Sequence, residues 1–174
     1  MDDDRMMIAL LHELDRLPVP DHLEHPEGYD HRRAGLRATE LADRLSEEFG
    51  GRCPLDRNED ASYYFAIGVP AELAEAGVHV GIRLSNYGDL AVVTTPSPDS
   101  HAGEDGAVAA GALSVADRRR IEAALSDLGY VQVPPRLLHR PFDGVTRLVD
   151  EDSVISHPPH QDVATRWTRF FEHL

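Results

Sequence analysis

The chain has 174 residues, the usual length of one domain, and its 41% hydrophobic and 28% charged residues exclude a wholly disordered chain. Its 31 aspartates and glutamates outnumber its 17 basic residues, all of them arginine, which gives a formal net charge of −14 at pH 7. Nucleic-acid binding requires clustered positive charge, and anionic membranes repel an acidic surface, so we expect no nucleic acid and no membrane as a partner.

A cytoplasmic location is expected from the cysteine content and from the start of the chain. Cys53 is the single cysteine, which excludes an intramolecular disulfide and fits a reducing compartment. Three aspartates follow Met1 where a secretory signal is basic, and the apolar run at 6–11 is too short for the core of such a signal. No stretch approaches the ~18 apolar residues of a membrane span.

Helical periodicity predicts two amphipathic helices at the start of the chain, over 4–17 and 32–49, with a polar loop at 18–31 between them. Pro18 stops the first helix, and Gly50 with Gly51 ends the second. The apolar face of the second helix is assigned to four residues: Leu36, Leu41, Leu45 and Phe49.

Alternation of apolar and polar residues then predicts a strand at 62–69 and a β-hairpin at 78–95. The hairpin is expected to turn at 86–89, because asparagine and glycine tolerate the positive φ of tight turns. Each strand has one apolar face, which indicates an antiparallel sheet covered by helices on one side.

The second half of the chain is predicted to hold two more helices, at 114–128 and 163–174. Ser114 and Asp117 form a capping-box pattern at the start of the first, and Gly129 follows its end. Residues 130–133 are expected to form a short strand, with a possible last strand at 144–149 and long loops at 96–113 and 150–162.

The resulting order, α-α-β-β-β-α-β-(β)-α, has consecutive strands instead of strands that alternate with helices, which favours the α+β class. We expect a single domain over 1–174. Its mostly antiparallel sheet of about four to five strands would pack against the N-terminal, central and C-terminal helices.

A histidine-rich segment at 21–31 is the candidate metal site, because imidazole and carboxylate groups are good zinc ligands. Its candidate ligands are His22, His25 and His31. A second loop contributes His157 and His160 as possible ligands. The competing interpretation is a solvated acidic loop, since Pro26 interrupts the His22–His25 spacing and no cysteine supports the site.

Exposed acids and one aromatic residue are the candidate partner-binding residues. Tyr87 is expected to be exposed at the hairpin tip, where it would serve as a contact. The acids lie in the two long loops: Asp99, Glu104, Asp105, Asp150, Glu151 and Asp152. The competing interpretation is a solvated charge run that aids solubility. The aromatic group Trp167, Phe170 and Phe171 is interpreted as the face that docks the last helix onto the sheet.

Motifs of common enzyme classes are absent from the sequence. It contains no G-x-S-x-G, no G-x-x-x-x-G-K-[ST], no G-x-G-x-x-G and no H-E-x-x-H, and without lysine it has no Schiff-base chemistry. Cys53 is interpreted as a partly buried structural cysteine, because it follows the end of a helix, whose dipole does not lower a thiol pKa. The sequence therefore favours a protein that is not an enzyme and needs no cofactor.

The leading hypothesis is a small acidic binding module that captures a basic protein partner by charge. In size, acidity, α+β layout and lack of catalytic motifs, the chain is similar to bacterial immunity proteins of polymorphic toxin systems. That likeness implies inhibition of a toxin by carboxylates that occupy its active site. The alternatives are a metal-binding protein or metal-dependent hydrolase built on 21–31, and a structural or homo-oligomeric component.

Overall fold

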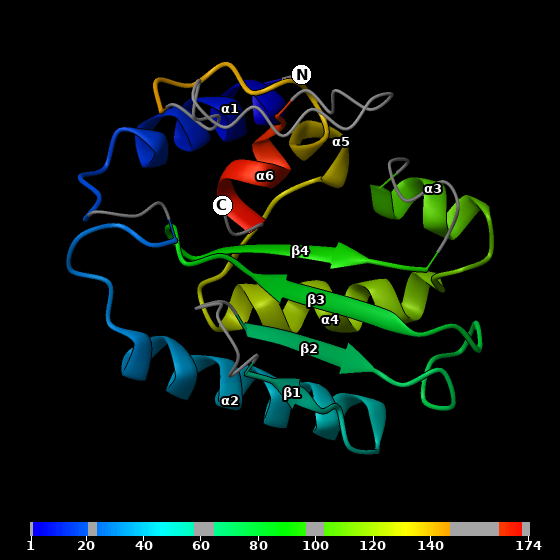
Figure 1. Ribbon diagram of the computed structural model, residues 1–174. Helices are drawn as coiled ribbons and strands as arrows, with labels where there is room; N and C mark the ends of the chain where they lie inside the picture. The colour runs from blue at the N-terminus through cyan, green and yellow to red at the C-terminus, as the bar shows by residue number, and fades with distance from the viewer. Residues whose placement is uncertain (1, 21–23, 58–64, 97–102, 147–163, 172–174) are drawn as a thin grey trace, which may run out of the picture.

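The computed structural model describes residues 2–20, 24–57, 65–96, 103–146 and 164–171 (Figure 1). One sheet has the order β1-β2-β3-β4-β5, with every neighbouring pair antiparallel except the parallel β4 and β5. The strands are β1 (Leu55–Asp56), β2 (Phe65–Val69), β3 (Val80–Leu84), β4 (Leu90–Thr94) and β5 (Val131–Gln132). The helices are α1 (Asp2–Asp15), α2 (His31–Phe49), α3 (Gly103–Ala109), α4 (Val115–Asp127), α5 (Pro135–Leu138) and α6 (Arg166–Phe171).

This arrangement confirms the α+β class and the mostly antiparallel sheet of five strands. The predicted helices at 4–17, 32–49 and 114–128 correspond to α1, α2 and α4, and the predicted hairpin is β3–β4. None of the helices in the described ranges is both long enough and apolar enough to cross a bilayer.

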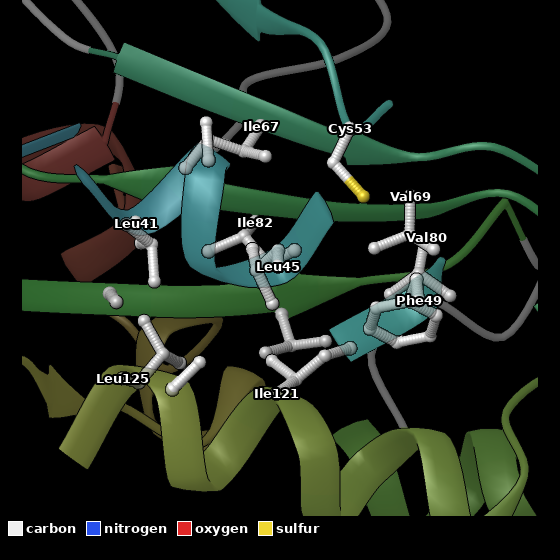
Figure 2. Packing of buried hydrophobic residues seen from close by; sticks show 14 of the residues in the cluster. Leu41, Leu45, Phe49, Cys53, Ile67, Val69, Val80, Ile82, Ile121 and Leu125 are labelled. Atoms are coloured by element: carbon white, nitrogen blue, oxygen red, sulfur yellow. The ribbon is translucent and has the colours of Figure 1, made fainter. Parts of the chain in front are cut away.

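The larger hydrophobic core lies between the sheet and the helices α2 and α4 (Figure 1). In β2 and β3 every second residue is buried, because successive side chains of a strand point to opposite faces. Figure 2 shows Ile82 of β3 beside Leu45 of α2, with Ile121 of α4 on the far side of Leu45 and Ile67 of β2 in the same core. Burial of each such side chain stabilises the fold by about 1.5–3 kcal/mol.

A second core lies on the opposite face, where α1, α5 and α6 cover β4 (Figure 1). The prediction of helices on one side only is therefore wrong. Within β4, Leu90 and Val92 belong to this second core, and Ala91 and Val93 belong to the first. A strand buried on both faces has a continuous apolar run, and the run at 90–93 has this pattern.

The helix ends follow the predicted capping chemistry in part. Gly50 ends α2 in the left-handed conformation at φ +68°, and Asp30 precedes α2 and accepts a hydrogen bond from Arg33 N at 3.0 Å. Ser114 Oγ accepts a hydrogen bond from Asp117 N at 3.0 Å. The second half of the capping box is not formed, because the buried Asp117 carboxylate accepts from the backbone amide of Glu75 instead, at 2.7 Å.

Three segments differ from the predictions. The predicted loop at 96–113 contains α3, whose Ala107 is buried in the larger core, so tertiary contact overrides a loop-like composition. In the predicted last strand at 144–149, residues 144–146 form no strand and the rest lies outside the described residues. The short strand β1 was not predicted, and it pairs Leu55 with Ile67.

Candidate functional site

Tyr87 is not the exposed contact residue that its place in the hairpin turn predicted. Its side chain is 1% exposed, because α1 and α6 cover the turn. The ring meets Phe170 edge to face with centroids 5.8 Å apart, and the Arg169 guanidinium lies 4.2 Å from its centroid. The prediction of an exposed Tyr87 is therefore wrong, and this residue belongs to the second core.

The two predicted contact acids in the described part of the 96–113 segment are paired within the protein. Glu104 is only 10% exposed, it accepts a hydrogen bond from Gln132, and its burial raises its pKa. Asp105 is 79% exposed but lies 2.6 Å from Arg118, which also contacts Glu104 and Glu122. Arg118 thus balances part of this negative charge. The other predicted contact acids, Asp99, Asp150, Glu151 and Asp152, lie outside the described residues.

The described histidines of the proposed metal loop make aromatic contacts. His25 stacks on Tyr29 with centroids 5.1 Å apart, and His31 stacks on Phe65 at 5.2 Å. No group of three or more histidine, cysteine, aspartate or glutamate side chains suited to a metal ion occurs among the residues that the structure describes. His22, His157 and His160 fall outside those residues, so a site that uses them stays a prediction.

Cys53 and the C-terminal aromatic residues belong to the hydrophobic cores. Cys53 is buried in the larger core as a free thiol, and burial raises its pKa, so it is a poor nucleophile. Phe170 and Phe171 are buried in the second core, with Trp167 packed against them. This confirms the interpretation of these aromatic residues as the docking face of the last helix.

The outward face of α2 has an acidic stripe that sequence reasoning did not single out. Leu36, Glu40, Asp43 and Glu47 are all exposed and recur at helical spacing opposite the buried face of α2; we call them the α2 stripe. Leu36 is 64% exposed, so its assignment to the apolar face is wrong. None of the three carboxylates has an ion-pair partner in the part of the chain that the structure describes.

The charges of α2 oppose its helix dipole. Arg32 and Arg33 lie in the first turn, where the partial positive charge of the helix disfavours cations, and Glu47 and Glu48 lie in the last turn, where anions are disfavoured. Each such placement at a surface costs about 0.3–1 kcal/mol. A surface helix that keeps charges against its own stability is a candidate for a functional surface.

A cavity of about 260 Å³ lies beside the first half of α2, and we call it the α2 pocket. Three rings from separate segments line it, those of Tyr29, Phe65 and Tyr130, together with two arginines of α2, Arg33 and Arg37. The remaining lining comes from the end of the loop before α2, from α2 itself and from the β3–β4 turn. The signal in the sequence was weak, because the rings are far apart along the chain.

Two surface features of α2 have no evident role in stabilising the fold. They are the acids of the α2 stripe and the α2 pocket. Comparisons of this chain with protein-family models, with curated proteins and with solved structures find no match.

Proposed function

We propose that the protein is a binding module that captures a basic surface of another protein through the α2 stripe. The observation that carries the proposal is the set of three exposed carboxylates of the stripe, Glu40, Asp43 and Glu47, without an ion-pair partner among the described residues. They differ in this respect from Glu104 and Asp105, which share Arg118.

Charge complementarity supports a basic partner. The net charge of −14 attracts a cationic surface over a distance and raises the rate of encounter. Carboxylates accept charge-assisted hydrogen bonds from arginine and lysine, and arginine can contact a carboxylate through two parallel bonds. The stripe therefore fits a partner that presents arginine or lysine side chains in a row.

Leu36 gives the stripe an apolar end. A leucine exposed over 64% of its surface, in line with three carboxylates, can lie against an apolar residue of the partner once the charges are in register. An inhibitor of the immunity type would use the same chemistry, with carboxylates in place of the phosphates that a toxin nuclease binds. The proposal requires only a basic protein surface.

The test is affinity capture from the source cell at low and at high salt, with three forms of the protein as bait. In the stripe variant, Glu40, Asp43 and Glu47 are all changed to glutamine. The control variant carries Glu13→Gln, Glu27→Gln and Glu72→Gln, which removes the same charge from exposed positions outside the stripe.

A supporting result is a basic protein that the wild type and the control variant retain at low salt and that the stripe variant loses. The affinity of the identified partner, measured with purified proteins, should fall by about tenfold or more in the stripe variant. Equal capture by all three baits, or equal loss from both variants, would contradict the proposal.

A further inference from the structure

The α2 pocket combines aromatic residues with two arginines and two aspartates, none of which belongs to the α2 stripe. Phe65 comes from β2, Tyr130 follows α4, and Tyr29 precedes α2, so the tertiary fold alone brings the three rings to one cavity. Binding sites for small molecules are typically concave, with aromatic walls and few polar groups. The α2 pocket, at about 260 Å³, is close to the lower end of the size range of such sites.

One wall of the pocket is held in place by Arg37. The Arg37 guanidinium lies 4.6 Å from the centroid of the Tyr130 ring and donates a hydrogen bond to Leu128 O at 2.8 Å. It also forms an ion pair with Asp89 in the β3–β4 turn. Arg37 therefore uses its charge and its donors to fix the position of Tyr130, and Asp89 balances its charge.

Arg33, exposed at the edge of the pocket, supplies a guanidinium to it, although Asp30 and Asp89 also line the pocket and match the two arginine charges in number. The Arg33 guanidinium has no hydrogen bond or ion pair with any residue in the described ranges, although its backbone amide donates to Asp30. One of the carboxylate oxygens of Asp30 already serves as the N-cap of α2. The free donor at this end of the pocket is thus a guanidinium, which suits a carboxylate or a similar anion.

The phenol of Tyr130 can donate a further hydrogen bond. Burial is the main cause that raises the pKa of Tyr29 and of Tyr130, so both phenols stay protonated at neutral pH. The Tyr130 hydroxyl makes no hydrogen bond to a described residue. A half-buried phenol without a partner is a ready donor to a polar atom of a ligand.

We propose that the α2 pocket binds a small organic anion that carries a flat ring, with the ring between Tyr29 and Tyr130 and the anionic group on Arg33. Tyr29 and Tyr130 are half-buried and can contact a flat ring, because aromatic rings stack or meet edge to face. Phe65 is 2% exposed and stacked on His31, so it closes the pocket on the side of the core. The anionic group matches the unpaired guanidinium. No residue of the α2 stripe lines the pocket, and the proposal does not depend on the protein-binding function.

The first test is isothermal titration calorimetry of the full chain with probes that separate the requirement for a flat ring from the requirement for an anionic group. Benzoate has both the ring and the carboxylate, benzamidine has the ring with a positive charge, and inorganic phosphate has the charge without a ring. We expect saturable binding of benzoate and at least about tenfold weaker binding of both other probes. Absence of saturable benzoate binding at millimolar concentration, or stronger binding of benzamidine or phosphate, would overturn the proposal.

The second test compares two neighbouring arginines in the first turn of α2. Arg33→Gln removes the guanidinium of the pocket, whereas Arg32→Gln removes an exposed charge that does not line it. Loss of a charge-assisted hydrogen bond should weaken benzoate binding by about tenfold or more in the first variant and leave it within about twofold in the second. Equal weakening in both would show general electrostatic attraction and refute the site.

A third variant tests the hydrogen bond from the Tyr130 hydroxyl and guards against misfolding. Tyr130→Phe keeps the ring and removes the hydroxyl, so benzoate binding should weaken by about fivefold while the denaturant midpoint stays near that of the wild type. The stripe variant should bind benzoate at least as tightly as the wild type, because it removes the Glu40 carboxylate, whose charge acts on Tyr130. Loss of benzoate binding in the stripe variant would contradict the separation of the two surfaces.

Discussion

Asp15 and Arg169 form a buried ion pair although they are 154 positions apart in the chain, with Arg169 Nε donating to Asp15 Oδ1 at 2.7 Å. Asp15 ends α1 and Arg169 lies in α6, so the pair joins the two helices that cover the hairpin turn. The other carboxylate oxygen of Asp15 accepts the backbone amide of Val145 at 2.6 Å. One carboxylate therefore ties three distant segments of the chain together.

Removal of this carboxylate should destabilise the protein strongly. Asp15→Asn leaves the Arg169 charge buried without its partner, and such a change typically costs about 3–5 kcal/mol. The free energy of unfolding from urea titrations measures the loss, with the exposed neighbour Glu13→Gln as control. The double variant Asp15→Asn/Arg169→Met should recover a large part of the loss, and a loss below about 1 kcal/mol in the single variant would contradict the role of the pair.

The same pair should make stability depend on pH in the acid range. Burial raises the pKa of Asp15, but hydrogen bonds from the side chains of Thr146 and Arg169 and from the backbone amides of Val145 and Thr146 outweigh it, so its pKa lies below the ordinary 3.8. The unfolded chain thus takes up the proton at higher pH than the folded protein does. The contribution of Asp15 is complete above the ordinary pKa and is lost as the pH falls through the lowered one.

The measurement is the difference in unfolding free energy between the wild type and Asp15→Asn at several pH values. The difference should be largest near neutral pH and shrink as the pH falls below the ordinary pKa of 3.8. A difference that stays constant over this range would show that the proton on Asp15 is not involved.

The Glu47 carboxylate at the end of α2 should lower the stability of the protein and strengthen binding of the basic partner. Glu47→Gln removes an anion from the last turn, where the helix dipole disfavours it, and should raise the unfolding free energy by about 0.3–1 kcal/mol. The same change removes one carboxylate of the α2 stripe and should weaken capture of the basic partner. Glu40→Gln, in the middle of the helix, should weaken capture without the gain in stability. Urea titrations that find Glu40→Gln more stable than Glu47→Gln would contradict the dipole argument.

Two leucines of α2 should differ in their contribution to stability. Leu45 is fully buried in the larger core, as Figure 2 shows, so Leu45→Ala should cost about 2–5 kcal/mol. Leu36 is exposed, so Leu36→Ala should change the unfolding free energy by less than about 0.5 kcal/mol. Urea titrations measure both, and a large loss for Leu36→Ala would indicate that this residue is covered in solution.

The sequence allowed correct prediction of the features that depend on local periodicity and capping. The buried residues Leu41 and Leu45 share a helical face, and Val80, Ile82 and Leu84 alternate along β3, because the repeat of each element dictates which side chains share a side. Gly50 and Ser114 mark helix ends by their own conformational and hydrogen-bonding preferences. The α2 stripe follows from the same repeat, since it lies opposite the buried face, although only the ion-pair geometry distinguishes it from the paired acids.

Only the tertiary structure decided which parts of these elements face solvent and which residues meet. Tyr87 occupies a turn, and it is buried because α1 and α6 cover it. The helix α3 forms in a segment of loop-like composition, where Ala107 packs into the larger core. The α2 pocket draws its rings from three segments, and Asp15 finds Arg169 near the other end of the chain. Local sequence sets backbone preference over a few residues, whereas burial and charge pairing depend on contacts between segments that the linear pattern does not encode.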